Sequence, residues 1–180
     1  MPAQQQPRQR GGMKSNDKVA VKKVRNGRGL VALRNLRRGA LVVEITGKIV
    51  TGEEVWEYWK KDPQRGANCF RYDDDHYIDP DGTLGQYANH SCHPNSAGFR
   101  VGRKLLIKAI RPILAGEEVT HDYSTFLGAD DVWTMRCNCG EAECRKRVRN
   151  VAKLPLAILR RYRRLGMIPD FIMATRRAVR

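Results

Sequence analysis

The sequence has no long apolar run and no apolar segment near its first residues. A membrane-spanning helix needs about 20 consecutive apolar residues, and a secretory leader needs a shorter apolar core behind a basic start. Neither requirement is met, so we expect a soluble, intracellular protein. No internal repeat is visible, and 180 residues are enough for a buried core that needs no disulfide bonds.

Acidic residues are scarce at both ends of the chain. Residues 1–28 contain eight Lys and Arg against Asp17 alone, and residues 145–180 contain twelve against Asp170 alone. The remaining residues, 29–144, hold 14 basic and 17 acidic side chains, so the net charge of +15 arises from the ends. Basic ends can bind a polyanion such as nucleic acid or can simply keep the termini solvated, and a mildly acidic middle can accept a cationic substrate.

Cysteines are few, but three of the five lie within eight residues, in the pattern Cys137-x-Cys139-x4-Cys144. In a reducing compartment, clustered thiols more often bind metal than form disulfides. Structural zinc takes four ligands in a tetrahedron, so a fourth ligand must come from elsewhere in the chain. Cys92 and His93 both qualify, and the frequency of all-thiolate sites favours Cys92. The alternative is a chance group of free thiols.

Short β-prone runs separated by turn signals predict small strands, which are expected at 19–21, 30–33, 41–45, 69–72, 76–78, 104–110 and 118–123. Thr51 followed by Glu54 is a capping-box signature and predicts one early helix over residues 51–61, ending near Pro63. Strands and helices do not alternate as in βαβ units, which argues against a Rossmann-type domain. The sequence therefore predicts a mainly β protein.

The two ends differ in character from the middle. Residues 1–16 are rich in Gln, Pro, Arg and Gly without periodicity, so we expect a disordered basic tail. Pro155 suits a first helical position, with Leu156, Leu159 and Tyr162 on one apolar face and Gly166 as a stop, and residues 169–178 can form a second helix. These helices either pack on the domain or face nucleic acid or another partner.

Three features carry little weight when each is taken alone. Asn26-Gly27-Arg28-Gly29 is typical of a hairpin turn, His90 of a structural histidine, and Tyr123 of a core residue with its hydroxyl hydrogen-bonded. By contrast, residues 87–95 (Tyr-Ala-Asn-His-Ser-Cys-His-Pro-Asn) contain no aliphatic side chain larger than alanine. Such a segment is not ordinary core.

The joint occurrence of four motifs in order is more specific. Gly-Arg-Gly at 27–29, Asn-His-Ser-Cys-x-Pro-Asn at 89–95, Glu-Glu-Val-Thr-x-Asp-Tyr at 117–123 and the cysteine cluster at 137–144 together resemble the SET-domain family of protein-lysine methyltransferases with its post-SET segment. The resemblance covers residues 17–147. It implies small curved β-sheets with a pseudoknot, a short early helix, a zinc-bound post-SET segment and C-terminal helices.

The resemblance, together with the composition of the two ends, predicts a domain organisation. Residues 1–16 would be a disordered basic tail, 17–128 the SET domain, 129–147 the post-SET zinc-binding segment, and 148–180 a basic helical extension. The substrate would be a histone or another basic protein with a target lysine, and no membrane is involved. The protein would be nuclear or chromatin-associated in a eukaryote and cytoplasmic in a prokaryote.

Site residues follow from the same resemblance. S-adenosylmethionine would be contacted by the backbone of Gly27, Arg28 and Gly29, and by Asn89 and His90. Tyr123 matches the catalytic tyrosine of the family and would also lie beside the cofactor. The zinc ligands would be Cys92, Cys137, Cys139 and Cys144.

The sequence departs from the family pattern at three places. Asn68 stands where many relatives have a tyrosine, and His121 stands where Phe or Tyr helps to set the number of methyl groups added; both residues are expected in the substrate channel. Relatives often have an aromatic residue shortly after the last zinc cysteine to cover the cofactor, but residues 145–148 (Arg-Lys-Arg-Val) contain none, although Trp133 could substitute. These departures keep two alternatives open: a catalytically weak SET-like module that binds nucleic acid or chromatin-like partners, and a zinc-stapled nucleic-acid adaptor.

Overall fold

The computed structural model describes residues 15–178, with side chains up to residue 175. Most of the segment expected to be disordered, residues 1–16, therefore lies outside the described residues. The side chain of Asn16 donates to the Val42 carbonyl at 3.1 Å and accepts from the backbone N–H groups of Lys18 and Val19, both at 2.8 Å. Asn16 thereby holds the start of β1 against β3.

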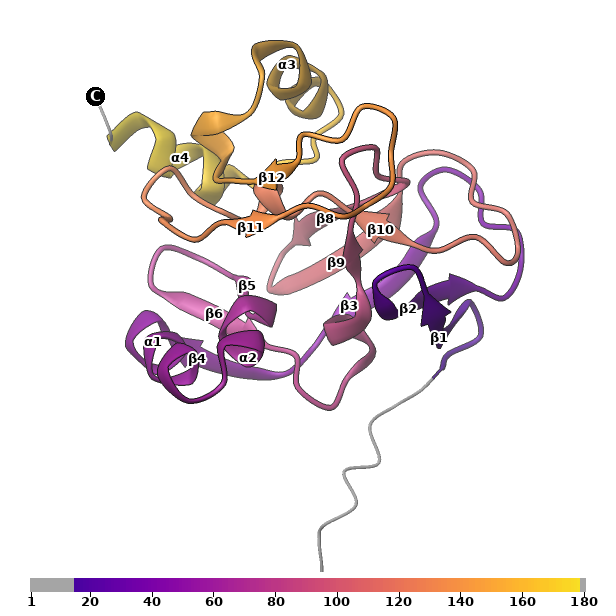
Figure 1. Ribbon diagram of the computed structural model, residues 1–180, viewed down its shortest axis with the longest axis horizontal. Coiled ribbons are helices and arrows are strands. Elements are labelled where there is room, and N and C mark those ends of the chain that lie inside the picture. The colour runs from indigo at the N-terminus through magenta and orange to yellow at the C-terminus, as the bar shows by residue number, and fades with distance from the viewer. Residues whose placement is uncertain (1–14, 179–180) are drawn as a thin grey trace, which may run out of the picture.

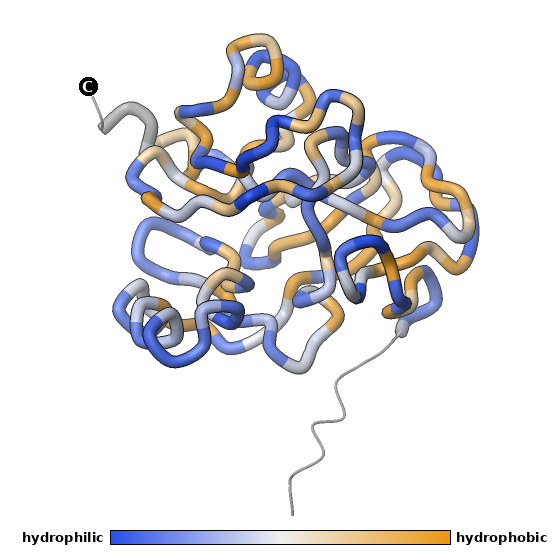
Figure 2. Tube along the Cα trace, viewed as in Figure 1, coloured by the Kyte–Doolittle hydropathy of each residue, from blue (hydrophilic) through white to orange (hydrophobic). Residues whose placement is uncertain are grey.

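The first strands match the β-prone runs of the sequence. β1 (Val19–Val24) and β2 (Gly27–Ala32) form an antiparallel hairpin in which Val24 pairs with Gly27. β3 (Leu41–Ile45), β9 (Lys104–Ala109) and β8 (Ser96–Val101) form an antiparallel sheet in the order β3-β9-β8. The hairpin and this sheet supply much of the main core, which includes Leu30, Val42, Leu105 and Ile107. In Figure 2 the hydrophobic residues follow these strands.

A second three-stranded sheet, in the order β4-β6-β5, carries the early helices (Figure 1). It contains β4 (Lys48–Thr51), β5 (Phe70–Arg71) and β6 (His76–Asp79). α1 (Gly52–Lys61) begins with the predicted capping box, because the Thr51 and Glu54 side chains each accept from the other residue's backbone N–H.

The prediction of a single early helix is wrong, because α2 (Pro63–Asn68) follows α1 directly. Proline lacks an N–H that a first helical turn would leave unused anyway, and its fixed φ suits that position. The Asp62 side chain caps α2 by accepting from the Arg65 N–H at 3.2 Å. Pro63 thus ends one helix and starts the next.

The segment of odd polar composition lies beside the segment that ends in Tyr123. η1 (Leu84–Tyr87) leads into β7 (Asn89–His90), which pairs in parallel with β10 (Thr120–His121). After β10 the chain turns through η2 (Tyr123–Thr125), so the predicted strand over 118–123 is shorter than expected. This parallel pairing places the two segments side by side, as the predicted pseudoknot requires.

The C-terminal part packs against the main sheet through a core cluster of its own. β11 (Met135–Arg136) pairs with β12 (Arg147–Val148), and η3 (Val151–Lys153), α3 (Leu156–Arg164) and α4 (Asp170–Ala178) follow. Leu159, Tyr162 and Ile172 are buried in this cluster with Ala97 of β8. The helices therefore pack on the domain, one of the two expectations for them.

Two details of α3 differ from the prediction. Leu156, expected on the apolar face with Leu159 and Tyr162, is 57% exposed. Pro155 is the N-cap rather than the first helical residue. At about 100° per residue, Leu156 lies about 120° from Tyr162 around the helix axis, which places it outside the buried face. Gly166 does end the helix, with φ of +64°, a conformation that glycine adopts without strain. No helix in the described range is long and apolar enough to cross a membrane.

Candidate active site and metal centre

The crossing of the two polar segments is fixed by side chains as well as by backbone. The Asn95 amide donates to the Glu118 carbonyl at 2.7 Å, and its carbonyl oxygen accepts from the Thr120 N–H at 2.9 Å. Ser96 Oγ donates to the Thr120 carbonyl at 2.8 Å. Because Asn95 bonds both neighbours of Val119 in this way, the strand leading to Tyr123 has a single position relative to residues 89–95.

Tyr123 lies in the wall of a narrow cavity of about 50 Å³. The walls are mostly apolar and aromatic, and they include Asn68, His121 and Trp133, all of which the sequence analysis singled out. The full lining consists of Ala67, Asn68, Cys69, Phe70, Tyr77, Gly85, Gln86, Ala88, His121, Tyr123, Phe126, Leu127 and Trp133. A cavity of this size and polarity suits a slender, uncharged side chain.

The Tyr123 hydroxyl donates to the Ala88 carbonyl at 3.2 Å. The ring lies near His121, His90 and Trp133, with centroid distances of 5.0, 5.3 and 6.5 Å. Burial raises the pKa of the phenol well above its usual value. At neutral pH the hydroxyl is therefore protonated, and its oxygen offers lone pairs to the cavity instead of a negative charge.

His121 is buried between aromatic rings. Its ring stacks on Phe70, with centroids 5.6 Å apart and planes 26° apart, and meets Phe126 edge-on at 5.7 Å. Burial lowers its pKa to about 3, so the imidazole is neutral at pH 7. Within the described part of the chain, its Nδ1 has no hydrogen-bond partner. The His121 side chain lines the narrow cavity, whereas this nitrogen atom is itself enclosed.

A polar cleft of about 630 Å³ lies on the other side of Asn68 and Gln86, two residues that line both hollows. Gly27, Arg28 and Asn89 also line the cleft. The Asn89 amide donates to the Arg28 carbonyl at 3.0 Å and to Glu118 Oε1 at 2.8 Å, which ties the hairpin to the polar segment. Three of the predicted cofactor residues thus lie at one cleft.

Arg28 lies over a tyrosine at the edge of this cleft. Its guanidinium carbon is 4.6 Å from the centre of the Tyr87 ring, and the same group donates to the Tyr87 hydroxyl. Gly29, by contrast, is covered, since an added Cβ would come within 2.7 Å of Asn89 Nδ2 and 2.9 Å of a Val24 methyl carbon. Glycine at 29 is therefore explained by close packing, whatever the ligand.

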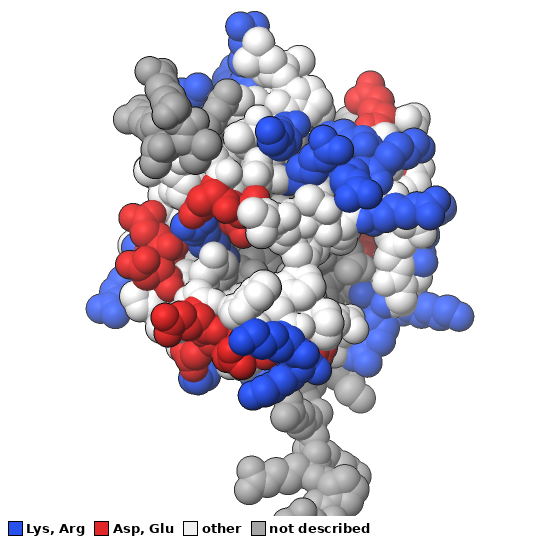
Figure 3. Space-filling model, turned by 60° about the vertical axis from the view of Figure 1, so that its left-hand side comes forward, with Lys and Arg blue, Asp and Glu red and all other residues white. Residues whose placement is uncertain are grey.

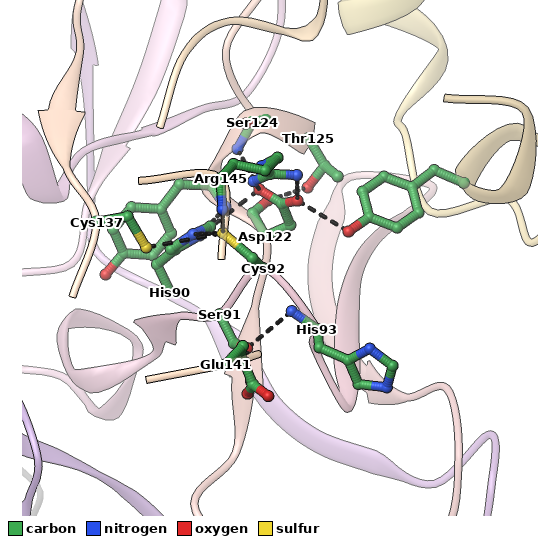
Figure 4. A network of polar contacts seen from close by, with 12 residues as sticks. His90, Ser91, Cys92, His93, Asp122, Ser124, Thr125, Cys137, Glu141 and Arg145 are labelled. Carbon is green, nitrogen blue, oxygen red and sulfur yellow. Dashed lines mark hydrogen bonds and ion pairs between the residues drawn. The ribbon is translucent and has the colours of Figure 1, made fainter. Parts of the chain in front are cut away.

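The His90 imidazole points away from the polar cleft and toward the cysteine cluster (Figure 4). Its Nδ1 accepts from the Tyr123 N–H at 3.2 Å, so the ring proton is on Nε2, which lies 3.4 Å from Cys92 Sγ. Burial lowers the pKa of His90 to about 4. Because both ring nitrogens of His90 already have partners, its backbone is the part available for the predicted cofactor contact.

Cys92, Cys137, Cys139 and Cys144 form one group, with all four sulfur atoms within 4.8 Å of one another. The Sγ atoms of Cys92 and Cys137 are 3.7 Å apart. Four sulfurs around Zn²⁺ at about 2.3 Å would be roughly 3.8 Å apart, so this arrangement fits a tetrahedral thiolate site. His93, the other candidate for fourth ligand, is outside the group, and Figure 4 shows its ring directed away from Cys92.

Backbone donors surround the sulfur atoms as a thiolate site requires. The N–H groups of Arg145 and Lys146 point at Cys92 and Cys144, each at 3.4 Å, and Lys146 adopts φ of +62° to do so. The Lys146 N–H lowers the pKa of Cys144 to about 7, whereas burial raises that of Cys92 to about 11. A bound cation would supply the positive charge that the buried thiolates need.

Asp122 is the most completely paired side chain in this region (Figure 4). Arg145 donates two hydrogen bonds to it, at 2.6 and 2.8 Å, and Tyr162 adds a third at 2.9 Å. The Ser124 N–H donates a fourth, at 3.0 Å. Asp122 is fully buried, yet these donors hold the pKa of its carboxyl below its usual value. This network joins Asp122, the residue before Tyr123, to α3 and to residues 137–149, which are called the cysteine segment below.

Sequence reasoning missed several residues that shape the site: Gln86 between the two hollows, the Asp122–Arg145 ion pair, and Tyr162 of α3. An acidic residue next to the candidate tyrosine and a cation directly after the last cysteine were the only available signals. Neither showed that the two would meet. Trp133, suggested as a cover for the cofactor, lines the narrow cavity and not the polar cleft.

Comparison with known proteins gives one family match and several relatives. The model of the SET domain matches residues 27–124. Over 128 residues the chain is 35% identical to Histone-lysine N-methyltransferase trr of Drosophila melanogaster and 37% identical to human Histone-lysine N-methyltransferase 2D, in each case covering 67% of this chain. Human Histone-lysine N-methyltransferase 2B is 35% identical over 145 residues, or 74% of this chain. The chain spans only 5%, 2% and 5% of these relatives.

Proposed function

Because the chain belongs to the SET-domain family, we propose that it transfers a methyl group from S-adenosylmethionine to the ε-amine of a lysine in a protein substrate. The relatives are named histone-lysine N-methyltransferases, and a histone or another basic protein is the proposed substrate. The observation that carries the proposal is the meeting of two unlike hollows at Asn68 and Gln86. One is polar and wide, and the other is narrow, mostly apolar and lined by Tyr123.

In this proposal the polar cleft holds the cofactor, which supplies an electrophilic methyl group. The backbone of Gly27, Arg28 and Gly29 and the Asn89–His90 strand would contact it, His90 through its main chain. Gly27 lines this cleft with φ of +93°, and an added Cβ there would meet nothing within 4 Å, so there is room for a ligand against this turn. Arg28 and Tyr87, held together at the edge of the cleft, would form its rim.

The narrow cavity receives the target lysine. An amine in water is protonated below about pH 10.4, and a protonated amine has no lone pair for attack. Apolar walls disfavour the charged form and lower its pKa, so the cavity favours delivery of a neutral amine. The rate enhancement then comes mainly from alignment, with the Tyr123 oxygen and the Ala88 carbonyl facing the reacting atoms. Burial raises the pKa of Tyr123, which keeps its hydroxyl protonated at neutral pH, and the proposal does not need it as a general base.

His121 and Asn68 bear on how many methyl groups are added. His121 is a polar side chain in the wall of the narrow cavity, and a water molecule held there would occupy the space that further methyl groups need. We therefore propose mono- or dimethylation as the outcome. Asn68, on the wall shared by the two hollows, would contact the amine or the methyl group.

Zinc is proposed at Cys92, Cys137, Cys139 and Cys144, as a structural ion with no open ligand position. Residues 17–128 would form the SET domain, 129–147 the post-SET segment and 148–180 the basic extension. A protein acting on chromatin would be nuclear in a eukaryote, and its bacterial counterpart would work in the cytoplasm. The Cys139→Ser variant should lose the metal and unfold at lower urea concentration, and a purified wild type with metal content near zero would remove this proposal.

The activity is tested with labelled S-adenosylmethionine and a panel of histones, basic nucleoid proteins and ribosomal proteins. Tyr123→Phe should lower kcat by about 100-fold, a typical loss for one stabilising group in a reaction centre. Tyr72→Phe is the matched control, because its hydroxyl also donates to a backbone carbonyl, that of Arg103, at 3.0 Å. Equal label transfer by wild type and Tyr123→Phe would overturn the proposed role.

The alternative proposal is a module that binds through its basic ends without catalysis. Asn68 in place of a channel tyrosine, and the arginines after Cys144 in place of an aromatic residue, favour it. Calorimetry separates the two proposals, since only the enzyme must bind S-adenosylmethionine. No measurable heat of binding, together with salt-sensitive affinity for nucleic acid, would favour the module.

A further inference from the structure

A groove of about 360 Å³, distinct from the narrow cavity and the polar cleft, lies where η2, the cysteine segment and the start of α3 meet. It is lined by Ser124, Arg145, Arg147, Arg149, Lys153, Leu154 and Pro155, and so contains four cationic side chains and no acidic one. The proposed methyl transfer does not use it.

The charges of the groove differ in whether they are already paired. Arg145 is neutralised by Asp122. Arg147, Arg149 and Lys153 are exposed, and within the described range none of the three makes an ion pair. Arg147 donates only to the Thr134 hydroxyl, at 3.1 Å. Three cations therefore face one groove without counter-ions from the protein.

One further feature of the groove suits an anion. α3 begins at Leu156 behind Pro155, which gives the helix no side-chain cap, so its first N–H groups present partial positive charge beside the groove. Ser124 lies in the lining, is 1% exposed, and its hydroxyl has no hydrogen-bond partner among residues 15–175. The Ser124 oxygen is enclosed, so the donors available to a phosphate group are the uncapped N–H groups and the three free cations.

The positive charge continues beyond the space that one phosphate would fill. Exposed arginines follow on α3, at positions 160, 161, 163 and 164, and residues 145–169 contain nine Lys and Arg and no Asp or Glu. Figure 3 shows that charges of opposite sign are separated on the surface, with Lys and Arg gathered at the upper right and most Asp and Glu toward the left. A row of cations fits a chain of phosphates better than a single one.

We propose that Arg147, Arg149, Lys153 and the start of α3 bind the phosphate backbone of nucleic acid, in a groove separate from the catalytic hollows. Contacts of this kind are independent of base sequence and weaken as salt releases them. The bound polymer would run from the groove along the arginines of α3. Because the groove includes Ser124, next to Tyr123, the enzyme would act on substrates that accompany nucleic acid.

The test uses the full-length, zinc-loaded protein and a fluorescent DNA duplex of about 20 base pairs, with anisotropy read from about 50 to 200 mM salt. The double variant Arg149→Glu/Lys153→Glu should raise Kd about tenfold and reduce the salt slope by about 2, one for each lost phosphate contact. The control is Arg37→Glu/Arg38→Glu, which changes net charge equally at two exposed arginines before β3. It should change Kd less than about threefold.

Each result decides the question. Equal loss in both double variants would mean that net charge alone attracts DNA, and no loss in either would mean that the groove is not used; both overturn the proposal. A phosphoserine peptide that competes as well as the duplex would also overturn it, in favour of a phosphoprotein partner. Methylation of a short free peptide should be unchanged in the groove variant, and Tyr123→Phe should still bind DNA, so failure of this proposal is distinguishable from failure of the proposed activity.

Discussion

Asp122 and Tyr123 are neighbours in the chain, but their side chains lie in opposite kinds of surroundings. Asp122 accepts from Arg145, Tyr162 and the Ser124 N–H, and has no exposed surface. Tyr123 makes a single hydroxyl contact, at 3.2 Å, and shares its cavity with His121, whose Nδ1 has none. The Asp122 carboxylate is fully paired, whereas the polar groups of the residues that line the Tyr123 cavity are not.

The two surroundings indicate two roles: the contacts of Asp122 stabilise the fold, and the cavity at Tyr123 is the proposed reaction centre. A buried charge is tolerated only when it is fully paired, so the Asp122 side acts as a brace between β10, the cysteine segment and α3. The Tyr123 side instead encloses a cavity, and a mostly apolar cavity with a few polar side chains in its wall is the usual form of a ligand site. We therefore expect changes around Asp122 to alter stability and changes around Tyr123 to alter activity.

The largest expected effect comes from removing the main partner of Asp122. Arg145→Met should lower the free energy of unfolding by about 3–5 kcal/mol, because it leaves a buried carboxylate without its two strongest donors. Urea denaturation of the zinc-loaded protein measures this loss. The Arg145 N–H that faces Cys92 belongs to the backbone and survives the substitution.

The surface pair Lys48–Glu54 is the matched control, at 2.7 Å with both side chains well exposed. Lys48→Met should cost less than about 1 kcal/mol, as exposed ion pairs do. Adding Asp122→Asn to Arg145→Met should restore part of the loss, since the orphaned charge is then gone. Equal losses of stability at the buried pair Asp122–Arg145 and the exposed pair Lys48–Glu54 would contradict the bracing role of Asp122.

A smaller effect is expected from the pH dependence of His121. Its pKa falls from 6.5 to about 3 on folding, so between these values the unfolded chain binds a proton that the folded chain does not. Stability is then complete above about pH 6.5 and declines as pH falls, by about 2 kcal/mol between pH 7 and pH 5. His121→Phe, which keeps an aromatic ring among Phe70 and Phe126, should remove this share of the decline.

The measurement is the difference between urea midpoints at pH 7 and pH 5 for both proteins. His90, with a pKa of about 4, adds a similar decline in wild type and variant, and proton competition for the cysteines is also common to both. Asp122 does not affect this comparison. Its pKa is lowered on folding, so the stability that the ionised carboxylate contributes is lost only below about pH 4. Identical pH dependence in the two proteins would mean that His121 is not buried as a neutral ring.

Much of the fold could be predicted because local signals determine it. The Thr51–Glu54 capping box, the β-prone runs before residue 45 and the stop at Gly166 act within a few residues of themselves. The cysteine cluster and its fourth member also followed from ligand chemistry and motif order, and the four sulfurs do lie together. Where one short segment decides the outcome, sequence reasoning was sufficient.

What could not be predicted depends on distant segments. Arg145 meets Asp122 across 23 residues and Tyr162 meets it across 40, and nothing in the local pattern of any of the three encodes the other two. Leu156 was placed inward because steps of three residues drift around the helix, so that Leu156 and Tyr162 are about 120° apart and only packing decides which of them is buried. The direction of the His90 ring, too, depends on Cys92 and Tyr123 being held on either side of it.

The smallest expected effect tests the division between the two sides of the chain most directly, because it compares two tyrosines that adjoin the same carboxylate, that of Asp122. Tyr162 is 2% exposed and donates to Asp122 at 2.9 Å. Tyr162→Phe removes one hydrogen bond to a charged group and should cost about 1.5 kcal/mol, while Arg145 still pairs the charge. Its kcat should stay within about twofold of wild type, since the hydroxyl touches no part of either hollow.

Tyr123→Phe should show the reverse pattern, with a stability loss of less than about 1 kcal/mol and a large fall in kcat. Both variants delete one buried hydroxyl and change nothing else in size or shape. Comparing urea midpoints and kcat for the two therefore separates the brace from the reaction centre without a change in packing. If Tyr162→Phe lowered kcat as much as Tyr123→Phe did, the Asp122 network would be part of the catalytic apparatus, and the division between the two sides of the chain would fail.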